Sequence, residues 1–132
     1  MKKLFILICS VLSIFSLSAQ IIPQPKVENY SSGEFTITNK SCLVYSNANI
    51  REAATYLLNY LPFKQMLCSP KTMDGDIVLD INRYLAEEGY KLTVDSKNIR
   101  ITGGSYAGVF NGIQTLLQLL PAEVYSGNAK FP

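Results

Sequence analysis

The segment from Ser105 to Pro121 contains the feature that most restricts how this chain can fold. Its apolar residues recur every three or four positions, which predicts a helix with a wide apolar stripe. The stripe consists of Tyr106, Val109, Phe110, Ile113, Leu116, Leu117 and Leu120. Ser105 is a good N-cap, and Pro121 ends the helix. Gly108 and Gly112 lie within it, where each costs about 1 kcal/mol relative to Ala. We therefore expect close packing of this helix on a sheet, and favour that explanation over a ligand contact at the glycines.

Short alternating segments predict the strands of that sheet. The last two are separated by a short polar connection, which indicates an antiparallel hairpin. The predicted strands are residues 34–38, 42–45, 76–81, 89–94 and 98–102.

A second amphipathic helix is predicted over residues 49–61, where Asn49 and Glu52 have the spacing of a capping box and Pro62 limits the helix. Helices laid on one face of a sheet bury both apolar stripes and the inward strand residues together. The predicted fold class is therefore α+β, with two layers, a mostly antiparallel sheet and two helices packed on one face.

Residues 1–19 have the pattern of a secretory signal peptide. Lys2 and Lys3 precede a mostly apolar run over residues 4–17, which is too short to span a bilayer, and Ala19 is the preferred cleavage position. We therefore expect a secreted or periplasmic protein with no membrane span. Removing residues 1–19 removes two lysines and no acids, so the remaining chain has 10 basic and 10 acidic side chains. This balance offers no electrostatic case for a nucleic-acid partner.

Few residues suggest chemistry. The chain has no His, which excludes Ser-His-Asp and Cys-His nucleophile systems and His-bound zinc. Glu87 and Glu88 are adjacent acids, but neighbours in extended chain point to opposite sides, so we expect a solvated turn. Residues 74–76 lack the remaining ligands of a calcium loop, and residues 103–105 are explained by a turn with an N-cap. We expect no catalytic, cofactor-binding or metal-binding residue.

Two cysteines, Cys42 and Cys68, remain after removal of the leader. In an oxidising compartment they could form a disulfide, and each could equally be a small buried side chain. One pair of cysteines at this spacing leaves both alternatives open.

Three longer segments resemble a known family. Residues 21–25 (Ile-Ile-Pro-Gln-Pro), 88–94 (Glu-Gly-Tyr-Lys-Leu-Thr-Val) and 104–121 are similar to the N-terminal domain of bacterial β-N-acetylhexosaminidases, glycoside hydrolase family 20. The resemblance runs from residue 21 to about residue 125, and the helix block is its most specific part. On this basis we divide the chain into a signal peptide (1–19), a hexosaminidase-type N-terminal domain (20–125) and the start of a linker (126–132).

The resemblance implies a non-catalytic α+β domain that packs against a following (β/α)8 barrel. In the family the barrel supplies a neighbouring Asp and Glu, and the substrate's acetamido group attacks while the Glu acts as general acid. No catalytic residue can be carried over to this chain, which ends at Pro132 in what resembles the linker. We expect the chain alone to hydrolyse nothing. Its expected partner is a (β/α)8 glycosidase barrel, which is missing from this chain. The alternatives are a free-standing carbohydrate-binding or scaffold module, or the leading domain of another glycosidase family.

Overall fold

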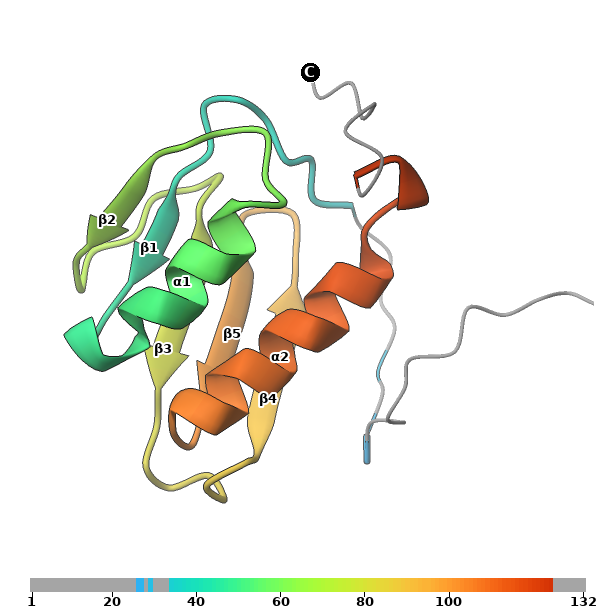
Figure 1. Cartoon of the computed structure of the whole chain (residues 1–132). Coiled ribbons are helices and arrows are strands. Elements are labelled where there is room, and N and C mark those ends of the chain that lie inside the picture. Colours follow the sequence, from blue (N-terminus) through green and yellow to red (C-terminus); the bar gives the residue numbers. More distant parts are fainter. Residues whose placement is uncertain (1–25, 28, 30–33, 125–132) are drawn as a thin grey trace, which may run out of the picture.

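A computed structural model describes residues 26, 27, 29 and 34–124 of the chain (Figure 1). The predicted signal peptide, the Pro-containing segment 21–25 and the predicted linker lie outside the described residues. Five strands and two α-helices form the described fold, with a short 3-10 helix before α1 and another after α2. In chain order the elements are β1 (Leu43–Tyr45), η1 (Ala48–Ile50), α1 (Arg51–Leu58), β2 (Met66–Cys68), β3 (Ile77–Ile81), β4 (Tyr90–Val94), β5 (Ile99–Gly103), α2 (Tyr106–Leu119) and η2 (Ala122–Val124).

The sheet has the strand order β2-β1-β3-β5-β4, and both α-helices lie on one of its faces (Figure 1). The α+β class and the two-helix layer are therefore confirmed. The prediction of a mostly antiparallel sheet is wrong, because β1–β2, β1–β3 and β3–β5 are parallel and β4–β5 alone among the described pairs is antiparallel. The reason is the connections: α1 returns the chain so that β2 runs parallel to β1, and the hairpin inserts β5 between β3 and β4.

Two strand assignments differ from the expectation. Residues 34–38 form no strand, although their side chains do alternate, with Ile37 buried and Phe35 packed against the core. The segment instead closes on a turn in which the Ser41 amide donates to the Thr38 carbonyl at 3.2 Å. Strand β2 was not expected, because its three residues are mostly exposed and show no alternation. Alternation thus reports which side chains are buried, whereas strand formation also needs a neighbouring backbone.

The first helix is shorter than expected at both ends. The predicted capping box is wrong: the side chain of Asn47, not Asn49, accepts a backbone N–H and caps η1 at 2.9 Å, and α1 follows at Arg51 without a side-chain cap. At the other end, the Leu61 amide bonds to the carbonyl three residues back, so the last turn is tighter than an α-helix and α1 stops at Leu58.

The core fills the space between the helices and the sheet, as the two apolar stripes predict. Its largest fully buried side chains are Leu43, Ile50, Leu57, Ile77, Leu79, Ile101, Val109, Ile113 and Leu116. Within the described residues, no helix combines the length and the apolar character needed to cross a membrane.

Close packing of α2 on the sheet explains its glycines. A Cβ atom at Gly108 would collide with the carbonyl oxygen of Gly89, and one at Gly103 would lie 2.6 Å from the carbonyl carbon of Gly108. At Gly112 the nearest atoms belong to the side chains of Ile101 and Tyr90. The expectation of helix-on-sheet packing is therefore confirmed, because the backbones of α2, β5 and the turn before β4 meet without intervening side chains.

Candidate functional sites

The adjacent acids Glu87 and Glu88 lie on a turn before β4, with both side chains exposed. Their main-chain carbonyls hold α2: the Ser105 hydroxyl donates to Glu87 O at 2.7 Å, and the Asn111 amide donates to Glu88 O at 3.1 Å. What the structure shows for this pair is thus a role of the backbone in positioning the helix.

Residues 74–76 also form a turn. Gly75 has a positive φ of 98°, a conformation that favours glycine. The Asp76 carboxylate, which is 5% exposed, accepts the Met73 amide at 2.7 Å and so closes the turn. Among the described residues, no group of three or more His, Cys, Asp or Glu side chains is placed to hold a metal ion.

The N-terminus of α2 is occupied by the protein itself. The Ser105 hydroxyl accepts the Ala107 amide at 3.1 Å, which confirms the predicted N-cap. A Cβ at Gly104 would collide with the Ala86 carbonyl and approach Leu85 O to 2.8 Å. Carbonyl oxygens are packed against this end of the helix, and that arrangement disfavours an anion.

Cys42 and Cys68 are free thiols on opposite faces of the sheet. Cys68 is in register with Tyr45, whose side chain belongs to the core, whereas Cys42 alternates with Leu43 and faces away from the helices. The two positions are three steps apart along β1, roughly 10 Å, which exceeds the Cα separation of about 7 Å that a disulfide allows. The structure therefore decides the question that the sequence left open, and the two cysteines are not bridged.

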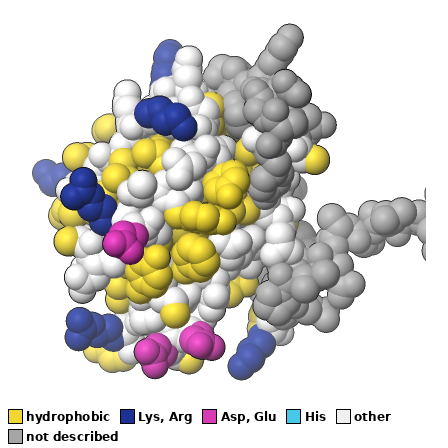
Figure 2. Space-filling model, in the orientation of Figure 1, with side chains coloured by type: hydrophobic (Ala, Val, Ile, Leu, Met, Phe, Trp, Pro, Cys, Tyr) yellow, Lys and Arg dark blue, Asp and Glu magenta, His cyan; other side chains and the backbone are white. Residues whose placement is uncertain are grey.

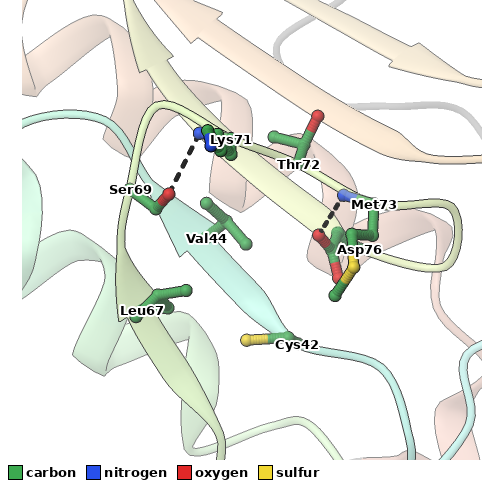
Figure 3. A pocket seen from close by; sticks show the side chains of 8 residues that line it. All are labelled: Cys42, Val44, Leu67, Ser69, Lys71, Thr72, Met73 and Asp76. Atoms are coloured by element: carbon green, nitrogen blue, oxygen red, sulfur yellow. Dashed lines mark hydrogen bonds between the residues drawn. The ribbon is translucent and has the colours of Figure 1, made fainter.

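A half-open hollow of about 500 Å³ lies on the sheet face opposite the helices (Figure 3). It was not predicted, because β2 and the loop that follows form one side of it. Residues Cys42, Val44, Leu67, Ser69, Lys71, Thr72, Met73 and Asp76 line it.

The polar groups of the hollow are largely engaged within its own loop. The Ser69 hydroxyl accepts the Lys71 amide at 3.0 Å, and the Asp76 carboxylate accepts the Met73 amide. Burial, with a further contribution from the Asp76 carboxylate, raises the pKa of the Cys42 thiol. The thiol is therefore protonated near neutral pH, and the hollow holds no activated nucleophile.

Comparisons with known proteins point to one family. Residues 18–132 match the sequence model of glycosyl hydrolase family 20, domain 2. Over 115 residues the chain is 36% identical to a Beta-hexosaminidase of Porphyromonas gingivalis (strain ATCC BAA-308 / W83), covering 82% of this chain and 15% of the relative. Over 100 residues it is 33% identical to a Beta-hexosaminidase of Vibrio furnissii, covering 76% of this chain and 16% of the relative.

A solved structure shows the same fold. The GH20 β-N-acetylhexosaminidase from Streptomyces coelicolor A3(2) superposes with a TM-score of 0.70 and 28% sequence identity, covering 79% of this chain and 22% of that protein. The 132 residues thus correspond to one domain of much longer relatives, and a barrel of roughly 250 residues does not fit within them. The resemblance of residues 21–25, 88–94 and 104–121 is confirmed: the chain belongs to glycosyl hydrolase family 20, as the non-catalytic domain 2 of the β-hexosaminidases.

Proposed function

We propose that this chain acts as the accessory domain of a secreted β-N-acetylhexosaminidase, and that its partner is the catalytic (β/α)8 barrel of such an enzyme. The observation that carries the proposal is the family match over residues 18–132, together with the turn and capping roles of the candidate site residues. The reaction assigned to the complete enzyme is hydrolysis of terminal N-acetylhexosamine residues. The domain's own contribution is structural: the carboxylates of Asp76 and Asp95 accept backbone amides within turns, and the main-chain carbonyls of Glu87 and Glu88 hold α2.

Secretion is part of the same proposal. It is supported by Lys2 and Lys3, the apolar run over residues 4–17 and the small residues ending at Ala19. Export followed by cleavage would make Gln20 the first residue, which N-terminal sequencing of the exported protein tests directly.

The experiment for the main proposal is an assay of the purified chain with a chromogenic N-acetylglucosaminide, with the Porphyromonas gingivalis Beta-hexosaminidase as positive control. We expect no turnover above the uncatalysed background. Measurable turnover by the chain alone would contradict a non-catalytic role. A calorimetric titration with chitin oligosaccharides should give no heat of binding, whereas saturable heat would favour a carbohydrate-binding module.

A further inference from the structure

Asp76 is the charged side chain that the described fold buries, and it lines the hollow on the outer face of the sheet (Figure 3). One of its carboxylate oxygens accepts the Met73 amide at 2.7 Å. Within the described part of the chain, the carboxylate forms no ion pair, and its other oxygen accepts no hydrogen bond. Removing a carboxylate from water is costly unless a cation and several donors satisfy it, so Asp76 is suited to a cationic ligand group.

The second oxygen of Asp76 can be reached from the hollow. It is not fully enclosed, so it keeps contact with solvent on the side that Asp76 lines. The turn that carries it is fixed to the hairpin, because the Gly75 amide donates to Lys97 O at 2.7 Å and the Asn98 side-chain amide donates to Met73 O at 2.8 Å. A carboxylate positioned in this way loses little freedom when a ligand binds, which favours affinity.

Lys71 is the second charged residue of the hollow, and its charge is opposite in sign. Its amide donates to the Ser69 hydroxyl at 3.0 Å, and its ammonium group forms no ion pair within the described residues. Figure 3 shows Lys71 beside Ser69 and Asp76 beside Met73, so the two charges lie apart. The apolar side chains of the lining are Cys42, Val44, Leu67 and Met73. The hollow therefore offers an anionic end, a cationic end and an apolar wall.

These groups disfavour several classes of ligand. The described residues contain no group of three or more side chains placed to hold a metal ion. None of the 8 lining residues is aromatic, so the hollow lacks a ring on which a sugar could stack. A simple anion would meet the Asp76 carboxylate, and a simple cation would leave Lys71 without a partner. A molecule with both charges, separated by an apolar body, pairs with both ends and covers the apolar wall.

We propose that the hollow binds a zwitterion, with its ammonium group on Asp76, its carboxylate group on Lys71 and its apolar body between them. ω-Amino acids and short apolar peptides with free termini share this chemistry. The proposal goes beyond the accessory role, and neither depends on the other. Figure 2 shows the helix side of the molecule, where hydrophobic side chains gather in the middle of the view. The hollow lies on the other face of the sheet, so a ligand in it leaves the helix side free.

A titration of the purified chain, followed by the amide signals in nuclear magnetic resonance spectra, tests the proposal. The probe is ε-aminocaproate. Two control compounds, n-hexylamine and hexanoate, have a chain of the same length and carry one charge each. The dipeptide leucyl-leucine distinguishes the two sources of the zwitterion.

Two variants remove the charges of the hollow one at a time. Asp76→Asn removes the negative charge and keeps an oxygen that can accept the Met73 amide; its matched control is Asp74→Asn, because Asp74 is exposed in the same turn. Lys71→Met removes the positive charge, and its matched control is Lys91→Met on β4, whose side chain is exposed outside the hollow.

We expect ε-aminocaproate to shift the amide signals of residues 69–76 saturably and to bind several-fold more tightly than either control compound. Asp76→Asn should weaken this binding roughly tenfold or more, since hydrogen bonds to charged groups are the strong ones. Lys71→Met should weaken it roughly threefold, because the side chain is exposed and its ion pair is screened by solvent. The two control variants should bind as the unaltered chain does. Tighter binding of leucyl-leucine than of ε-aminocaproate would assign the site to peptides, and the reverse order to ω-amino acids.

Cys42 supplies a second readout that needs no variant. Its thiol lines the hollow, whereas Cys68 lies on the other face of the sheet. Saturating ε-aminocaproate or leucyl-leucine should therefore slow alkylation of Cys42 by iodoacetamide several-fold and leave the rate at Cys68 unchanged. The proposal is wrong if neither zwitterion binds, if the singly charged compounds bind as tightly, or if Asp76→Asn binds as Asp74→Asn does. Should Asp76→Asn fail to fold, an unchanged alkylation rate at Cys42 overturns the proposal. In each of these cases the proposed accessory function stands.

Discussion

Replacing Gly108 with Ala sets two effects of one methyl group against each other. In an isolated helix the change stabilises by about 1 kcal/mol. In the folded protein the new Cβ would collide with Gly89 O and would lie 3.2 Å from both Glu87 O and the Gly103 Cα. These are backbone atoms, and Gly89 O already accepts the Gly104 amide at 2.9 Å. Neither the Gly89 carbonyl nor the backbone of α2 can therefore rotate away from the contact. We therefore expect α2 to be displaced from the sheet.

The expected magnitude follows from these contacts. Overpacking of this kind costs about 1–3 kcal/mol, and loss of one backbone hydrogen bond at the same place costs about 1 kcal/mol. The gain in helix propensity offsets about 1 kcal/mol. The net loss of unfolding free energy for Gly108→Ala is therefore about 1–3 kcal/mol, a fall in Tm of roughly 5–20 °C for a domain of this size.

Urea unfolding followed by far-ultraviolet circular dichroism measures this loss. Ala107→Gly is the matched control, since it makes the reverse change one residue earlier in α2 and should show only the propensity cost of about 1 kcal/mol. Gly112→Ala should be milder than Gly108→Ala, because its Cβ meets side chains that can shift. A Gly108→Ala protein more stable than the unaltered chain would refute the argument from close backbone contact.

Three further predictions concern other parts of the fold. The Tyr90 and Thr115 hydroxyls are 2.6 Å apart, so Tyr90→Phe and Thr115→Val should each cost about 1 kcal/mol by urea unfolding, and the double variant should cost less than their sum. Backbone N–H groups donating to Asp95 lower its pKa below the ordinary 3.8; its stabilising effect is therefore present above that pH and lost as pH falls through the lower value in the folded protein. Asp95→Asn should flatten the fall of Tm over this acid range, and an unchanged profile would contradict the assignment. Mass spectrometry after alkylation without reductant should find both Cys42 and Cys68 modified, with the exposed Cys68 reacting faster in the native protein; a mass two hydrogens lower that resists alkylation would indicate a bridge.

The hairpin of β4 and β5 and the helix α2 could be predicted because their determinants are local. The short polar connection between the strands, the N-cap Ser105 and the terminal Pro121 all act on the chain within a few positions. The structure accordingly has β4, β5 and α2 close to the predicted bounds. The glycines of α2 were also interpreted correctly, since a helix tolerates them when another backbone approaches closely.

Strand direction could not be predicted in the same way. Leu43 pairs with Ile77, which follows only after α1 and β2. The sequence around either residue contains no local signal for parallel or antiparallel pairing. Strand β2 was missed for a related reason: Met66, Leu67 and Cys68 are held by β1 on one side only, so they show no buried alternation. A segment such as residues 34–38 shows the reverse case, with alternating burial and no paired strand.

The candidate sites show the same difference between local and non-local determinants. The cap at Ser105 was predicted as local structure, and its hydrogen bond to the Ala107 amide confirms it. The separation of Cys42 from Cys68 depends on strand register, and the contact between the rings of Tyr56 and Phe110 depends on the packing of α1 beside α2; neither is encoded in a short segment.

The position of β5 between β3 and β4 has a consequence for the order of folding. β4, β5 and α2 are consecutive and in contact, so this half of the domain can assemble with short loop closures. β1 can pair with β2 and β3 as soon as these are made, but β3 gains its second neighbour only with β5, because β4, which follows β3 directly, pairs with β5 and not with β3. Non-local parallel pairing is slow, so the junction between β3 and β5 should be the last part of the sheet to close. A chain emerging from its N-terminus therefore completes its sheet only after residue 103 has been made.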